Sequence, residues 1–543
     1  MTSRADRPAE LALTGGPVST MDGWDAAAVA VRGGRVAALD PDRVRALIGP
    51  STAVVDLRGR RVLPGLHDAH AHPLFGGIER LRCDLADSPE AQECLRRVGE
   101  HARSVAHPQW ILGGGWEMGL FPGGAPERRP LDAVTGRRPA YLLSRDHHSA
   151  WVNSAALELA GIDRGTPDPP DGRIERDRDG SPSGTLHEGA AELVAAVLPT
   201  AGADEYRRGL LEGQRFLHAH GVTSWHDAIL GTYLGYRDAL ETYLDLDRRG
   251  LLTATVRGAL WWRRERGLDQ VEELAQRRSR ARGERFRADA VKIMVDGICE
   301  NLTAALRDPY LGDHGSGLSF VDGHELAGAV RALDARGFPV HFHAVGDRAV
   351  HEALNAVEHA RTANGPSGLP HQIAHVQLID PAELPRFAQL GVTATIQAAW
   401  AVNDADMTEL TTPLLGAERA RRQYPFRSLR DAGAALAAGS DWPVSEADPL
   451  RAAHVAVNRS DPGSGQEPFV PEESLRLQDV VAAYTSGSAR VNRLDDRIGA
   501  LRVGMDADLV VLDRDPFSLP AREIGDTRVD LTFARGQLVH ERK

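Results

Sequence analysis

Three His-x-His pairs are the residues of this chain whose type and spacing best suit metal binding: His70/His72, His218/His220 and His341/His343. The spacing alone is weak evidence, because 21 histidines placed at random in 543 residues give about one such pair. Secondary structure separates the three, since residues two apart share a face of a strand but not of a helix.

Two of the pairs lie in strand-like sequence. His218/His220 ends the helical pattern YRRGLLEGQRFLHAHG, where an interaction with the helix C-terminus is the better interpretation. His70 and His72 instead end the strand-like LPGLHDAHAH, and His343 ends FPVHFH. His341 shares the face of His343 but lies further from the strand end, so we expect it behind the metal ligands rather than among them.

Two more candidates follow strand-like runs: His375 in QIAHVQ and Asp441 in AALAAGSD. Imidazole nitrogen and carboxylate oxygen are ligands that Zn²⁺ takes in catalytic sites with one open position. Each residue alone has an ordinary alternative, a hydrogen-bonded core histidine or an aspartate that caps a turn. Their joint placement at separate strand ends favours a metal site.

Lys292 gives independent support for this metal site. Only Lys292 and Lys543 are lysines, so 62 of the 64 basic residues are arginine. Lys292 lies in the strand-like AVKIMVDG, where a buried ammonium is costly unless paired. A neutral lysine reacts with CO₂ to give a carbamate whose oxygens bridge two metals, which arginine does not do. The alternative is a salt bridge to Asp296 or Glu300. We expect one or two Zn²⁺ ions, with a binuclear site on carbamylated Lys292 favoured.

Strand-like and helix-like segments alternate along the part of the chain that must position these residues, which predicts an α/β fold. We expect a (β/α)₈ barrel over residues 63–496, with an insertion at residues 74–202. Both ends of the chain, residues 1–62 and 497–543, are rich in short strands and glycine turns, and we expect them to form one composite β-domain. The eight strand-like runs start with VLPGLHDAHAH and continue at 221–228, 252–260, 290–297, 338–346, 371–378, 393–400 and 434–443.

Composition narrows the classes of partner. The formal charge of −12 without a dense Lys/Arg run argues against nucleic acid, and no run of about 18 apolar residues predicts a membrane span. Three cysteines are too few for a disulfide framework. We expect a cytoplasmic protein that acts on a small molecule, without nucleic acid or membrane partners; a homodimer is compatible with these features.

Seven motifs resemble, in order, the landmarks of the amidohydrolase superfamily, and most closely amidohydrolase family 3, which includes N-substituted formamide deformylases. The resemblance implies a distorted barrel with a composite β-sandwich, and a metal site of His70, His72, Lys292, His343, His375 and Asp441. The motifs are PGLHDAHAHP, GVTSWHDA, VKIMVDG, HFHAVGDRA, IAHVQ, GSDWPV and IGALRVGMDADLVVLDRDP; the inserted segment adds WILGGGWE, LDAVTGRRPAYLLSRDHHSAWVNSAAL and GTLHEGAAEL.

The expected activity is metal-dependent hydrolysis of an amide or formamide-type C–N bond in a small molecule. A catalytic zinc activates water and polarises a carbonyl; Asp441 is expected to take the proton from that water and pass it to the leaving amine, with His375 beside it in catalysis. The alternatives are a deaminase or cyclic-amide hydrolase on the same metal site, or a catalytically silent ligand-binding barrel.

Residues that flank the motifs are candidates for contact with substrate. Trp116, His148, Trp151 and Trp442 are predicted to line an apolar pocket, although core packing is the ordinary role of a tryptophan. Glu188 either binds a polar substrate group or starts a helix. Two positions depart from the family pattern, His147 where glycine is expected and Ala398 where proline is expected. Both departures concern specificity rather than the metal site.

Overall fold

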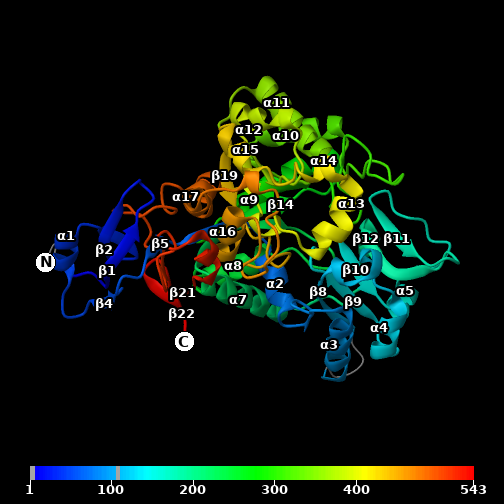
Figure 1. Ribbon diagram of the computed structural model, residues 1–543, viewed down its shortest axis with the longest axis horizontal. Helices are drawn as coiled ribbons and strands as arrows, with labels where there is room; N and C mark the ends of the chain where they lie inside the picture. Colours follow the sequence, from blue (N-terminus) through cyan, green and yellow to red (C-terminus); the bar gives the residue numbers. More distant parts are fainter. Residues whose placement is uncertain (1–6, 105–109) are drawn as a thin grey trace.

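The computed structural model describes residues 7–104 and 110–543, and its centre is an eight-stranded, all-parallel sheet that curls into a nearly closed barrel (Figure 1). The strand order is β19-β18-β17-β16-β15-β14-β13-β6. This confirms the predicted fold class. The strands are β6 (Leu66–Ala71), β13 (Val222–Leu230), β14 (Thr255–Trp261), β15 (Phe286–Met294), β16 (Val340–Ala344), β17 (Gln372–His375), β18 (Thr393–Ile396) and β19 (Ala435–Ala438).

The barrel strands are largely buried on both faces, as in parallel sheets that are covered by helices. All nine positions of β13, VTSWHDAIL, are buried. The covering helices α10 (Gly323–Ala335), α11 (Asp347–Asn364) and α12 (Leu384–Leu390) lie outside the sheet (Figure 1). Their ends follow local sequence: Asp322 caps α10 by accepting N–H bonds, and Gly391 ends α12 at φ +64°.

The barrel is joined between its first and last strands by the chain just after β19. The Asp441 N–H donates to the His70 carbonyl at 2.7 Å, and the His72 N–H donates to the Trp442 carbonyl at 2.8 Å. This approach requires Gly439, because a Cβ at that position would lie 2.6 Å from the His70 nitrogen. The closure therefore places Asp441 directly beside the first histidine pair.

A second sheet unites the two ends of the chain, as predicted. Strand β5 from the N-terminal part pairs with β20 from the C-terminal part, and α1 (Pro41–Leu47) packs on β2. The domain boundaries given above stay predictions, and residues 1–6 and 105–109 of those ranges lie outside the described residues. The sheet contains β1 (Leu11–Ser19), β2 (Asp25–Arg32), β3 (Arg35–Ala38), β4 (Ala53–Asp56), β5 (Val62–Pro64), β20 (Leu509–Leu512), β21 (Val529–Ala534) and β22 (Gln537–Glu541).

The insertion after β6 carries a third sheet that the sequence did not predict. This mixed sheet has its own hydrophobic cluster, and it lies on the opposite side of the barrel from the terminal sheet (Figure 1). Its last strand, β12, ends at Glu188. The strands are β7 (Cys83–Asp84), β8 (Ile111–Trp116), β9 (Ala140–Ser144), β10 (Ser149–Val152), β11 (Gly172–Arg176) and β12 (Pro182–Glu188).

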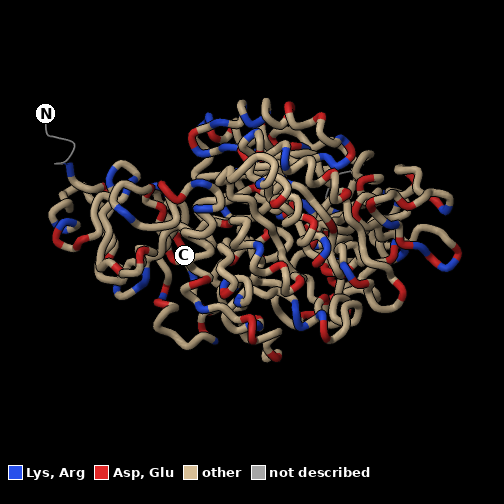
Figure 2. The backbone as a smooth tube through the Cα atoms, turned by 90° about the horizontal axis from the view of Figure 1, so that it is seen from above, with Lys and Arg blue, Asp and Glu red and all other residues tan. Residues whose placement is uncertain are grey.

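Acidic and basic residues are interspersed along the whole backbone (Figure 2). Among the described residues, every helix is too short or too polar to cross a lipid bilayer.

Candidate metal centre

The predicted metal ligands converge at one end of the barrel. His70 lies on β6 and His72 directly follows it, Lys292 lies on β15, His343 on β16 and His375 ends β17. Asp441 follows β19. All six side chains are buried, with at most 6% of any residue exposed. Since the carboxyl ends of barrel strands meet at one face, strands distant in sequence deliver these groups to one point.

Asp441 is at the centre of the group. Its Oδ1 lies 3.2 Å from His70 Nε2 and 3.0 Å from His72 Nε2, and its Oδ2 lies 3.8 Å from His375 Nδ1. Ligand atoms of His70, His375 and Asp441 all fall within 4.8 Å of one another. The His343 ring centroid lies 4.3 Å from that of His375. The geometry thus brings nitrogen and oxygen donors within reach of a shared cation.

The state of these donors fits a metal ion. Both ring nitrogens of His375 lack a hydrogen-bond partner within the described part of the chain, although the residue is only 1% exposed. Such an orphan is costly unless something ligates it. Burial also holds the pKa of His70, His343 and His375 well below the ordinary value, so these imidazoles are neutral, the form that binds metal.

Lys292 is buried beside the same donors. Its Nζ lies 3.4 Å from His70 Nε2, and it forms no ion pair with any described residue. The alternative salt bridge is absent, because Asp296 accepts three backbone N–H groups and Glu300 accepts the Thr411 hydroxyl. Burial lowers the pKa of Lys292 to about 7, although the negative charge of Asp441 acts to raise it. A substantial fraction of this amine is therefore neutral near pH 7.

Buried groups behind the donors hold them in place. His341 Nε2 contacts His70 Nδ1 at 2.8 Å, as expected from its deeper position. Asp68 accepts the backbone N–H groups of His70 and Ser440, each at 3.0 Å, and so ties β6 to the segment that carries Asp441. Such outer contacts orient metal-binding side chains. His218 lies elsewhere, at the end of α7 (Ala203–Ala219), bonded to the Val222 carbonyl and the Thr253 hydroxyl.

Backbone strain is also concentrated here. His375 has φ +78° and Asp441 has φ +59°, and in the insertion His147 and Glu188 have φ +61° and +51°. Non-glycine residues rarely adopt this region, and such residues persist mainly at functional sites.

The three tryptophans predicted to touch substrate do not line the cavities beside the donors. Trp116 and Trp151 pack in the core of the inserted sheet, and their indole N–H groups donate to the Leu142 and Glu127 carbonyls, each at 2.9 Å. Trp442 stacks on Phe216 at 4.9 Å in the barrel core. Each of the three indoles therefore packs within a hydrophobic core, and their contact with substrate stays a prediction.

The insertion does bring His148 and Glu188 to the site. His148 Nδ1 lies 2.7 Å from Glu188 Oε1, and the His148 ring lies 5.3 Å from that of His343. Glu188 also accepts from Asn301 at 3.2 Å and Thr303 at 2.9 Å. Burial opposes protonation, but Glu188 outweighs it and raises the pKa of His148 to about 9.

Sequence reasoning missed two neighbours of the centre. Trp400 stacks on His375 with 5.2 Å between ring centroids, and its position just after β18 was the available signal. Glu79 Oε1 lies 2.7 Å from His147 Nε2, a pairing that no sequence signal indicated. His147 lines the small cavity next to the donors, whereas Ala398 is buried in the core. Of the two departures from the family pattern, only His147 reaches the site.

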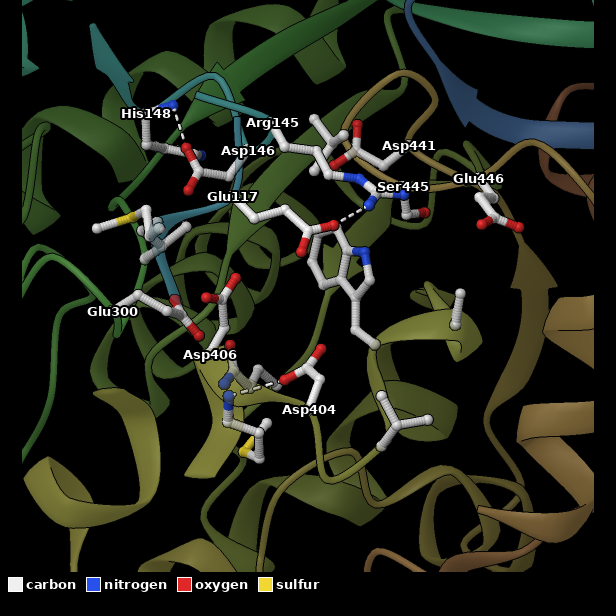
Figure 3. A pocket seen from close by; sticks show the side chains of 18 of the residues that line it. Glu117, Arg145, Asp146, His148, Glu300, Asp404, Asp406, Asp441, Ser445 and Glu446 are labelled. Carbon is white, nitrogen blue, oxygen red and sulfur yellow. Dashed lines mark hydrogen bonds and ion pairs between the residues drawn. The ribbon is translucent and has the colours of Figure 1, made fainter. Parts of the chain in front are cut away.

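A larger cavity of about 380 Å³ opens beside the donors (Figure 3). His148, His343 and Asp441 line it, so a small molecule in this space would lie against both the insertion and the metal ligands. The volume is within the ordinary range of small-molecule sites.

A barrel that gathers histidines and an aspartate beneath such a cavity defines a metal-dependent hydrolase. The chain belongs to the amidohydrolase family, whose sequence model matches residues 53–540. This confirms the resemblance to family 3, and the protein is an enzyme that hydrolyses carbon–nitrogen bonds.

Individual relatives span almost the whole chain. It is 31% identical to Protein LONG AFTER FAR-RED 3 of Arabidopsis thaliana, over 99% of this chain and 93% of the relative. It is 27% identical to the N-substituted formamide deformylase of Arthrobacter pascens, over 98% of each. Among solved structures, an uncharacterized metal-dependent hydrolase from Pyrococcus horikoshii aligns with a TM-score of 0.73 and 26% identity, covering 94% of this chain and 99% of that one.

Proposed function

We propose that this amidohydrolase cleaves an amide or formamide-type C–N bond of a small molecule at a zinc centre of one or two ions. The observation that carries the proposal is the position of Asp441, a carboxylate in contact with three neutral imidazoles at the edge of a cavity. The residues that would hold the metal are His70, His72, Lys292, His343, His375 and Asp441. When bound, zinc polarises a carbonyl and lowers the pKa of water.

Asp441 is the proposed general base and acid. Burial opposes its ionisation, but the hydrogen bond from His72 and the neighbouring His375 lower the pKa of its carboxyl below the usual range. It is therefore ionised at neutral pH and can accept the proton of the attacking water. As the C–N bond breaks, the same proton passes to the amine nitrogen, which leaves a carboxylic acid and an amine. His375, beside Asp441, is proposed to share in this step by holding the carboxylate in place.

His148 is the proposed contact with the substrate carbonyl. Its Nδ1 is bound to Glu188, which leaves Nε2 for the cavity side. With a pKa of about 9, the imidazole is protonated at neutral pH and donates from Nε2. A donor aimed at an oxygen that gains negative charge stabilises the transition state. In this view Glu188 acts through His148 rather than on the substrate.

Lys292 is proposed to become a carbamate. The neutral amine attacks CO₂, a nitrogen–carbon bond forms as one C–O π bond of CO₂ breaks, one proton is released, and the carbamate oxygens would be among the groups that hold the metal. Its pKa of about 7 and its lack of an ion pair within the described part of the chain support this assignment.

The test combines metal analysis with product detection. Protein prepared with zinc and bicarbonate is expected to contain two zinc ions per chain and to release amine from N-formyl or N-acyl amines, with activity lost to a chelator and restored by zinc. Lys292→Arg should lower the metal content, whereas Lys543→Arg, the matched control at the other lysine, should not.

Each contrary result has a distinct meaning. One ion unaffected by Lys292→Arg would establish a mononuclear site with a structural lysine. Release of ammonia from aminated heterocycles, without amide hydrolysis, would establish a deaminase. Absence of stoichiometric metal would refute the metal centre and favour a ligand-binding barrel.

A further inference from the structure

The large cavity is strongly acidic. Eight carboxylate residues and two arginines line it. The arginines neutralise only part of this charge: Arg145 pairs with Glu117 (Figure 3), and Arg451 pairs with Glu446 and Asp461. The remaining carboxylates, apart from Asp441 of the metal centre, are Asp146, Glu300, Asp404 and Asp406.

Three of these form what we call the acidic end: Glu300, Asp404 and Asp406. In Figure 3 they lie across the cavity from Asp441. Glu300 comes from the loop after β15, and the two aspartates come from the segment that starts the π-helix Asp406–Thr411. Within the described chain none has an ion pair; their contacts are neutral donors, the Thr411 hydroxyl and the N–H groups of Met407 and Gly119.

The three carboxylates repel one another. Burial, with the charges of Asp404 and Glu300, raises the pKa of Asp406 to about 8. Asp404 is exposed at the cavity edge, and partial desolvation, with charges that include Glu117, raises the pKa of its carboxyl to about 6. A cation placed among them would favour their ionised forms and relieve this repulsion.

Independent evidence for a ligand comes from buried polar side chains that line the same cavity with an atom left free. Gln377 Oε1 and the Tyr424 hydroxyl have no hydrogen-bond partner among the described residues, although the two residues are only 2% and 3% exposed. Burial and the charges of Glu300 and Asp404 both raise the pKa of Tyr424, which indicates that its hydroxyl is near the acidic end. Neither oxygen is fully enclosed by protein, so both are open to a ligand in the cavity.

We propose, on the basis of the hydrolytic function above, that the substrate carries a primary ammonium group remote from the scissile C–N bond, and that this group binds at the acidic end. An ammonium has three N–H donors and no acceptor, which suits carboxylate, amide and hydroxyl oxygens. Met118, Ile298 and Trp400 supply apolar wall for the methylene chain that joins the two ends of the molecule.

Three formamides with the same five-methylene chain test the proposal: mono-N-formylcadaverine (cation), N-formylhexylamine (neutral) and N-formyl-ε-aminocaproate (anion). We expect kcat/KM to be about tenfold higher for the cation than for the neutral compound, and about tenfold lower again for the anion, as a difference of about 1.4 kcal/mol per step gives. Asp404→Asn and Asp406→Asn should each reduce the cation-to-neutral ratio several-fold. Glu409→Gln should not, because Glu409 lies on the π-helix that begins at Asp406 but does not line the cavity.

Binding of cadaverine, measured by calorimetry on zinc-loaded and zinc-free protein, separates this proposal from the proposed function. In one outcome, no formamide is hydrolysed, yet cadaverine binds the parent protein and the Glu409→Gln variant and does not bind the Asp404→Asn variant, which is still folded. The ammonium site then stands and the hydrolytic proposal fails. If hydrolysis proceeds without preference for the cation and cadaverine does not bind, the ammonium site is refuted and hydrolysis stands. Binding of Ca²⁺ at the acidic end in place of cadaverine would also refute it.

Discussion

Replacing Glu188 by glutamine tests how the insertion contributes to catalysis. Glu188 is 5% exposed and accepts from His148, Asn301 and Thr303. Glutamine keeps the size and one acceptor oxygen but removes the charge. Burial by itself lowers the pKa of His148, and the Glu188 charge is the main influence that raises it to about 9.

The size of the effect follows from that shift. Without the carboxylate, the pKa of His148 should fall to or below its ordinary value of 6.5. At pH 8 the protonated fraction would then drop from about nine-tenths to about 3%. If protonated His148 donates to the substrate carbonyl, kcat/KM at pH 8 should fall roughly 30-fold, and the alkaline limb of the pH profile should move from about pH 9 to about pH 6.5 or lower.

The assay is kcat/KM against pH between 5 and 10 at constant metal content. Glu175→Gln is the matched control, because Glu175 pairs with His187 at 3.1 Å in the same inserted sheet and neither residue lines the cavity. The control should keep the limb near pH 9. An unmoved limb in Glu188→Gln, or an equal shift in both variants, would refute the role given to His148.

The same pair predicts a trend in stability. The folded-state pKa of His148 is raised above 6.5, so its contribution to the free energy of unfolding is full below about pH 6.5 and is lost as pH rises through about 9. Between these pH values, the melting temperature should therefore fall more in the parent protein than in Glu188→Gln. Asp441→Asn should keep fold and zinc but lose about 10²–10⁴-fold in kcat, the range of general acid–base catalysis; an Asn variant with full turnover would contradict the assignment. Trp151→Ala should cost about 3–5 kcal/mol in urea unfolding with little change in KM, because the indole fills a core; a raised KM at unchanged stability would return Trp151 to the substrate pocket.

The barrel was predictable because its strands are marked locally. Runs such as VTSWHDAIL on β13 are rich in β-branched and apolar residues, and glycines and capping aspartates mark the helix ends between them. The inserted sheet carried no such regular alternation. Its β7 has two residues, and β8, ILGGGW, contains three consecutive glycines, so its strands depend on pairing with distant neighbours that the sequence does not reveal.

Some residues of the candidate site could likewise be predicted from local sequence, and others could not. His343 and His375 could be predicted as candidate ligands because a histidine near the end of a barrel strand occupies a position that the fold itself defines. Trp116 and Trp151 could not be placed, since an indole in a core and an indole in a pocket have the same sequence signature. The Glu79–His147 pair joins residues 68 positions apart and depends on where α2 (Pro73–Glu79) meets the inserted sheet.

The proposed metal ligands and the proposed substrate-binding residues come from different parts of the fold. The proposed metal ligands lie on or directly after barrel strands, where a substitution disturbs a buried, hydrogen-bonded sheet. His148 and the acidic end lie in the insertion and in loops after β15 and β18, which the barrel supports but does not include. Changes in those loops can therefore alter which molecule is bound while the ligand geometry persists. On this argument, an amidohydrolase with the same donors but neutral residues at the positions of Asp404 and Asp406 should cleave the same kind of bond and lose the preference for an ammonium group.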